Sequence, residues 1–157
     1  MARLRSVVRS KDHEEMVQKL SRQSVDGKQT VFRTIRELLC FAAMLGFQME
    51  KKAPLADNVR GEDVMIEEFE RNESVDLIYL IAVADTGGTE ILKSDSDIDM
   101  VSIFEEYING GFDILKGWLQ QYRDEVGFQA ILQGLKANGF IDDETADIQT
   151  IMDSFKF

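Results

Sequence analysis

The segment Val101–Tyr122 constrains the fold more than any other part of this sequence. Its apolar residues recur at helical spacing, so that one face carries Phe104, Tyr107, Ile108, Phe112, Leu115, Trp118, Leu119 and Tyr122. This pattern predicts one long amphipathic helix. Gly110 and Gly111 interrupt it, and each interior glycine costs a helix about 1 kcal/mol relative to alanine. We therefore expect a compensating feature at this point, either the close approach of another helix backbone or a kink.

The rest of the chain favours a mainly α-helical fold, a compact helical domain with one short N-terminal strand. Arg3–Arg9 is typical of a short strand or an extended arm, and Glu50–Gly61 of a polar connector. Ser74–Ala84 is apolar almost all round, which fits a buried helix or a buried strand, and its helical neighbours favour the helix. Further helices are expected at about Lys11–Gln23, Thr30–Phe47, Glu62–Arg71, Phe128–Ala137 and Glu144–Phe155.

The last two of these helices would form a C-terminal hairpin. Residues 1–122 are accordingly predicted to be a helical core domain, with the hairpin of residues 123–157 packed on it. The chain has 157 residues and is 44% hydrophobic, which is enough apolar mass for a proper core. Its single cysteine excludes an internal disulfide. No apolar stretch approaches the roughly 20 residues of a membrane helix, and no secretory segment follows Met1, so we expect a cytoplasmic protein.

Charge is distributed unevenly along the chain. The net charge of −11 argues against nonspecific coating of nucleic acid by the whole surface. Residues 1–52, however, hold 11 Lys and Arg against 6 Asp and Glu, whereas residues 53–157 hold 7 against 23. A basic N-terminal end on an acidic body can mark a contact surface, and it can equally be a chance excess on a solvated face.

The basic end supplies the candidate binding residues. Guanidinium and ammonium groups on an arm and two helices could contact DNA phosphates, and a strand followed by two helices also occurs in small dimeric DNA readers. Arg33 and Arg36 lie three residues apart and are expected to face solvent or a ligand. The alternative is that these residues balance acidic groups of the same molecule or of a partner copy. The predicted DNA-binding residues are Arg3, Arg5, Arg9, Lys11, Lys28, Arg33 and Arg36.

One acidic motif resembles a calcium-binding loop in part. Asp95, Asp97, Asp99 and Glu106 match its charged positions, but Met100 stands where the loop needs glycine for its sharp turn. We therefore interpret the segment as an acidic loop that caps the helix starting near Val101.

The residues needed for covalent chemistry are scarce. His13 is the only histidine and Cys40 the only cysteine, and Cys40 lies among apolar residues of an expected helix, as a buried inert thiol would. Adjacent carboxylates are common in so acidic a chain and fit solvated surface. We expect no catalytic residues, no metal site, no cofactor and no enzymatic activity. A nickase built on the acidic loop is the third alternative after a DNA-binding protein and a protein adaptor.

Three stretches resemble the DNA phosphorothioation-associated protein 4 family, also called Dnd system-associated protein 4. They are Phe32–Leu55 (FRTIRELLCFAAMLGFQMEKKAPL), Asp76–Ser94 (DLIYLIAVADTGGTEILKS) and Ile103–Leu115 (IFEEYINGGFDIL). With the basic first helix the similarity spans about residues 8–122, and it identifies a relative better than a site. It implies association with systems that replace a non-bridging oxygen of the DNA backbone by sulfur, and with their restriction machinery in phage defence.

The resemblance supplies no catalytic residues to carry over. Together with the residue pattern it leads us to expect a non-enzymatic accessory or regulatory component of such a system. This component would contact DNA or the partner complex through the basic N-terminal end. The alternative is an adaptor whose acidic face, residues 62–106, docks a basic partner protein without touching DNA. The expected partners are DNA, other proteins of the system and further copies of the chain, but not a membrane.

Overall fold

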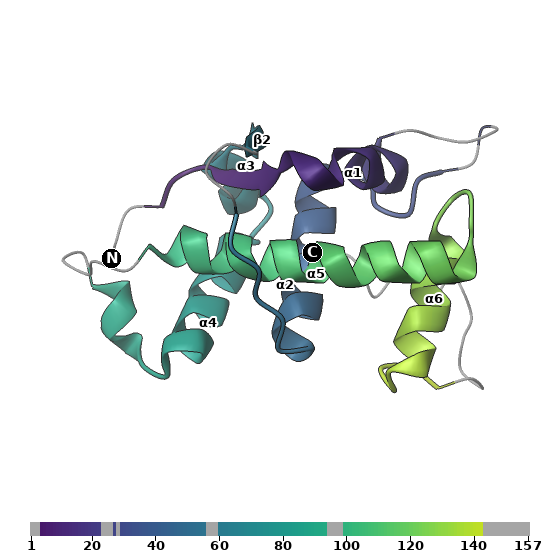
Figure 1. Ribbon diagram of the computed structural model, residues 1–157. Helices are drawn as coiled ribbons and strands as arrows, with labels where there is room; N and C mark the ends of the chain where they lie inside the picture. The colour runs from purple at the N-terminus through teal and green to yellow at the C-terminus, as the bar shows by residue number, and fades with distance from the viewer. Residues whose placement is uncertain (1–3, 23–26, 28, 56–59, 94–98, 143–157) are drawn as a thin grey trace.

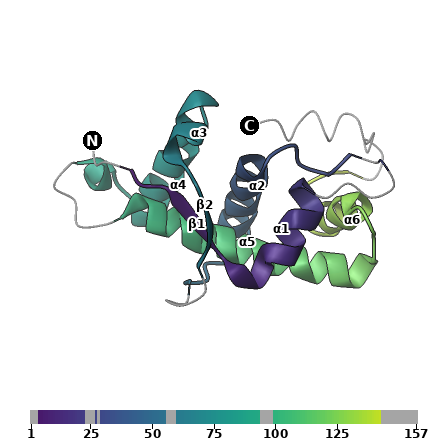
Figure 2. The same ribbon diagram turned by 90° about the horizontal axis from the view of Figure 1, so that it is seen from above.

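The long helix α5, Met100–Tyr122, forms the axis of the computed structural model. The structure describes residues 4–22, 27, 29–55, 60–93 and 99–142. Figure 1 shows the other helices arranged along α5, and Figure 2 places α3 and α4 towards one of its ends and α6 towards the other. The predicted mainly α-helical fold is confirmed.

The second core helix, α2, covers Ile35–Gln48 and crosses α5 at its glycines. A Cβ atom at Gly111 would overlap the backbone carbonyl of Ala42, and one at Gly46 would overlap the backbone of Tyr107. The two helix backbones therefore touch, which is the compensating feature expected for Gly110-Gly111. α2 begins later than the predicted Thr30, because Thr34 caps it by accepting a hydrogen bond from the Glu37 amide.

The N-terminal segment forms one strand of a two-stranded sheet. β1 covers Val7–Ser10 and is followed by the 3₁₀ helix η1, Lys11–His13, and by α1, Glu14–Ser21. β1 pairs antiparallel with β2, Arg60–Val64, in a register that places Val7 opposite Val64 and contains an irregularity between Val8 and Ser10. The strand in Arg3–Arg9 was predicted, but β2 was not.

The prediction of a helix from Glu62 is wrong at its first residues. α3 covers only Ile66–Arg71, after the extended residue Met65. Val64 is buried, and its backbone pairs with a strand more than 50 residues earlier in the chain. This long-range pairing overrides a weak local helical pattern, because buried backbone groups need hydrogen-bond partners.

The next helix, α4, covers Val75–Thr86 and confirms the choice of helix over strand for this segment. It is not buried all round, since Ile78 and Ala82 face the core while Leu80 is 66% exposed. The 3₁₀ helix η2, Thr89–Leu92, follows it.

The final described helix, α6, covers Phe128–Ala137 and packs on α5. A Cβ atom at Gly134 would overlap the ring of Trp118, so the indole lies directly against the α6 backbone. The predicted partner helix Glu144–Phe155 lies outside the described residues. The largest core side chains include Phe32, Leu38, Leu39, Phe69, Ile78, Phe104, Ile108, Phe112 and Leu115.

Candidate functional site

Three described residues of the predicted basic end, Arg5, Arg9 and Arg36, form contacts within the protein, beginning with Arg5. Its Nη1 and Nη2 donate to both carboxylate oxygens of Glu105 at 3.0 and 2.8 Å, and its Nε donates to Asp99 at 2.9 Å. Glu105 is only 5% exposed and also accepts the Val8 amide at 2.6 Å. The hydrogen bonds to Glu105 raise the pKa of Arg5 above its ordinary value. One buried carboxylate on α5 thus holds the arm and β1 in place.

Two further arginines of the predicted set are buried. Arg9 is 1% exposed, and its Nη2 donates to Glu14 at 2.9 and 3.1 Å. Hydrogen bonds from Gln18 and Arg9, together with the positive charges of Arg9 and Arg22, lower the pKa of Glu14 despite its partial burial. Arg36 donates to the Ser74 hydroxyl. The expectation that Arg36 faces solvent is wrong, because the turn before α4 covers that side of α2.

The remaining members of the set differ in whether the structure describes them. Lys11 and Arg33 are exposed, and Arg3 and Lys28 lie outside the described residues. Contact between these seven residues and DNA stays a prediction.

The reactive side chains show ordinary structural environments. Burial raises the pKa of the Cys40 thiol to about 11, in agreement with the expected buried thiol. Burial lowers the pKa of His13, whose Nε2 lies 3.4 Å from Asp113. Within the described ranges, no group of three or more His, Cys, Asp and Glu side chains is placed to hold a metal ion.

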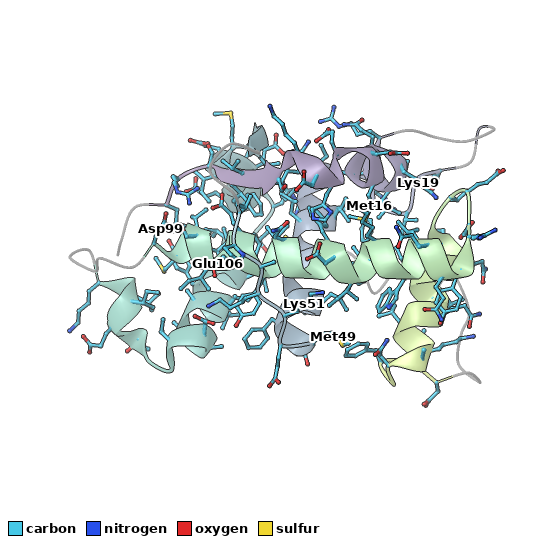
Figure 3. The ribbon with its side chains drawn as sticks, viewed as in Figure 1. Met16, Lys19, Met49, Lys51, Asp99 and Glu106 are labelled. Atoms are coloured by element: carbon cyan, nitrogen blue, oxygen red, sulfur yellow. The ribbon has the colours of Figure 1, made fainter. Side chains whose placement is uncertain are left out.

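The acidic loop behaves as a helix cap at its described end. Asp99 accepts the Val101 amide and is the N-cap of α5, as predicted. Glu106 lies further along the same helix (Figure 3). Its carboxylate is 3.7 Å from Lys52 Nζ. Asp95 and Asp97 lie outside the described residues.

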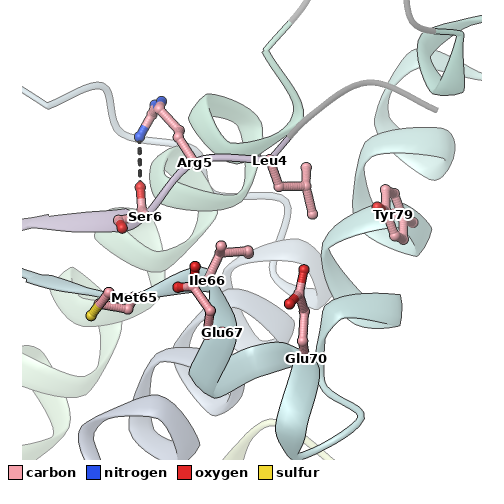
Figure 4. Close-up of a pocket in the computed structure, with 8 residues that line it drawn as sticks. All are labelled: Leu4, Arg5, Ser6, Met65, Ile66, Glu67, Glu70 and Tyr79. Carbon is pink, nitrogen blue, oxygen red and sulfur yellow. Dashed lines mark hydrogen bonds between the residues drawn. The ribbon is translucent and has the colours of Figure 1, made fainter.

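An open groove of about 660 Å³ lies between α3, α4 and the N-terminal arm, which is the segment Leu4–Ser6 before β1. Figure 4 shows Leu4 from the arm, Glu70 from α3 and Tyr79 from α4 around it. Its acidic groups Glu67 and Glu70 are exposed, and they form no ion pair with any other described residue. The lining residues are Leu4, Arg5, Ser6, Met65, Ile66, Glu67, Glu70 and Tyr79.

The groove combines apolar surface with uncompensated negative charge. Met65, one of its lining residues, is 58% exposed. Among the lining residues that the structure describes, the one basic residue, Arg5, already pairs with Glu105. The acidic face predicted at residues 62–106 contains the α3 and α4 walls. The arm wall was missed, since no local pattern indicates where Leu4 packs.

The fold and this groove define a mainly helical protein with an open groove that acidic and apolar side chains line. A family model described as DNA sulphur modification system-associated protein 4 matches residues 6–151, and the chain therefore belongs to this family. The match continues well past residue 122, where the resemblance seen in the sequence ended. No curated protein and no solved structure matches the chain. None of the helices described is long and apolar enough to span a membrane.

Proposed function

We propose that this protein is a non-enzymatic accessory component of a bacterial DNA phosphorothioate modification and restriction system. It acts in the cytoplasm by docking another protein of that system in the groove between the arm, α3 and α4. The family description supports association with such a system. The groove supports docking, because the exposed side chain of Met65 and the unpaired carboxylates of Glu67 and Glu70 all line it.

The charge of the groove determines what kind of segment it fits. Glu67 and Glu70 lie on one exposed helix, and the chain as a whole carries a net charge of −11. A partner segment rich in Lys or Arg would be attracted to this face, whereas an acidic one would be repelled. The occupant that complements the groove is a basic segment of another protein.

Apolar contacts would supply much of the affinity. Met65 and Tyr79 present partly exposed apolar surface on opposite walls. Covering a side chain such as Met65 contributes about 1–2 kcal/mol, based on roughly 25 cal/mol per Å² of apolar surface. We therefore expect the partner segment to carry apolar side chains between its basic residues.

Binding between purified components tests this proposal. The full chain is titrated with each other protein of the system, and the variant Met65→Ser/Glu70→Lys is compared with the control Glu125→Lys, which changes an exposed carboxylate beyond α5. The groove variant should bind its partner at least about tenfold more weakly, as expected for a central contact. The control should bind like the wild type. Equal affinities for all three proteins would refute docking in the groove.

Direct contact with DNA through the N-terminal end is the second candidate, supported by the exposure of Lys11 and Arg33. Contacts with several phosphates would make the affinity fall steeply as salt rises. Duplex DNA with and without sulfur is therefore titrated at low and moderate salt, with Lys11→Glu/Arg33→Glu as the variant. Absence of binding at low salt rejects this candidate, as does binding that the variant leaves unchanged.

A further inference from the structure

We propose that a second, smaller pocket, at the start of α2, binds a tetrahedral oxyanion of the phosphate type. The pocket has a volume of about 350 Å³, within the usual range of roughly 300–1,000 Å³ for small-molecule sites. Six of the eight lining residues that the structure describes are polar or charged, and three of these are Arg9, Arg22 and Arg33. This inference goes beyond the proposed docking function and depends on none of the groove residues.

The three arginines come from separate segments of the chain. Arg9 lies in β1, Arg22 is the C-cap of α1, and Arg33 precedes the N-cap of α2. The fold therefore assembles a basic cluster that is not contiguous in the sequence. The prediction from the sequence included Arg9 and Arg33 but not Arg22.

Two of these arginines have guanidinium groups available for a ligand. The Arg9 side chain is fixed in the wall by its ion pair with Glu14. Arg22 and Arg33 are exposed, and their side chains form no hydrogen bond or ion pair with another residue in the described parts of the chain. A guanidinium group offers a planar fork of N–H donors that matches two oxygens of a phosphate.

The start of α2 adds donors and a favourable field at the same place. Thr34, the N-cap, and Ile35, the first residue of this 14-residue helix, both line the pocket. The positive end of a helix dipole favours an anion there. Thr34 Oγ1 accepts the Glu37 amide, so its hydroxyl hydrogen is left to donate to a ligand.

The local charge balance distinguishes this pocket from the rest of the surface. Glu68 is the only carboxylate among the described lining residues. Glu14 already pairs with Arg9 and Glu37 accepts the Arg33 amide, so the positive charge of the pocket comes from the guanidinium groups of Arg22 and Arg33. Such a positive site on a chain with a net charge of −11 attracts small anions in particular, because the surrounding surface repels extended polyanions. The ligand chemistry is that of a phosphate, either a free small molecule or one phosphate of a DNA backbone.

Titration of the full-length protein with inorganic phosphate tests the proposal. Calorimetry at constant ionic strength, with chloride as the reference anion, should give saturable binding. Arg22→Gln and Arg33→Gln should each weaken it by about tenfold, in line with the strength of charge-assisted hydrogen bonds. Arg123→Gln, which removes an exposed arginine after α5, is the matched control and should have no effect. Circular dichroism of each variant verifies that it is folded.

The proposal fails if phosphate acts no differently from chloride, or if the double variant Arg22→Gln/Arg33→Gln binds phosphate like the wild type. Competition then identifies the source of the ligand. A short duplex that displaces phosphate, and binds more weakly to the double variant, indicates a backbone phosphate. A mononucleotide that displaces phosphate where the duplex does not indicates a free small molecule. The groove variant Met65→Ser/Glu70→Lys should keep its phosphate affinity, so failure of docking and failure of this proposal are separate results.

Discussion

The arm and the groove beside it use charge in opposite ways. In the arm, Arg5 forms an ion pair with Glu105, and in β1 Arg9 forms one with Glu14. On α3, Glu67 and Glu70 are exposed and form no ion pair with any described residue. Arg5 and Arg9 thus contribute to the fold through their ion pairs, while Glu67 and Glu70 are unpaired in the described structure. A count of charges cannot distinguish these roles, because it does not show which charges are already paired.

The largest effect on stability is expected when the carboxylate that holds the arm is removed. Glu105→Ala should lower the free energy of unfolding by about 3 kcal/mol, since it leaves Arg5 and the Val8 amide without their shared acceptor. Glu106→Ala, the adjacent position, removes only a half-exposed contact with Lys52 and should cost less than about 1 kcal/mol. Chemical denaturation measures both values. Equal losses would contradict the assigned role of Glu105.

The next largest effect on stability is expected where α2 crosses α5. Gly111→Ala should cost about 2 kcal/mol, because its Cβ would overlap the Ala42 carbonyl and force the two helices apart. Gly117→Ala, in the same helix, meets open space and should instead stabilise the protein by about 0.5–1 kcal/mol. Thermal or chemical unfolding of the two variants gives the comparison. A stabilising Gly111→Ala would show that the backbones are not in contact.

The crossing and the glycines show what can be predicted from sequence. The helical spacing of apolar residues in α5 and the local cost of Gly110-Gly111 are properties of one segment. They correctly predicted the helix, and they predicted either a close backbone contact or a kink, of which the structure shows the contact. β2 could not be predicted in this way, since Val64 becomes a strand residue only by pairing with Val7. The orientation of Arg36 depends likewise on Ser74, which lies 38 residues later.

The same limit applies to the two candidate sites. The acidic face was predicted from composition, but Leu4 joins it only through the fold. The arginine pocket contains Arg22, which no sequence motif marks, beside two arginines that were predicted. Sequence patterns therefore identified residue types, whereas the convergence of segments determined which of them form a site.

A change of pH should affect stability less than the glycine substitution does, through His13, Glu14 and Asp99. His13 has a lowered pKa, so the unfolded chain takes up its proton first, and stability should fall as the pH drops below the ordinary histidine pKa of 6.5. Glu14 and Asp99 also have lowered pKa values, and the stability that they contribute should be lost only below about pH 4.5. Denaturation at pH 7.5, 5.5 and 3.5 should thus show two successive losses. His13→Gln should remove the first loss and keep the second.

The smallest effect on stability is expected in the groove. Glu67→Gln/Glu70→Gln should change the free energy of unfolding by less than about 0.5 kcal/mol, because both carboxylates are exposed and unpaired in the described structure. A loss similar to that of Glu105→Ala would show that the groove carboxylates are part of the fold, and the contrast between the two regions would be wrong.

Hydrogen exchange of the protein alone, and mixed with the other proteins of the system, tests whether a partner docks in the groove. We predict that a partner slows exchange of the backbone amides of Met65, of α3 and around Tyr79. The amides of β1, already bonded to β2 and Glu105, should change little. Protection confined to other surfaces, with none at α3, would contradict a docking role for the groove.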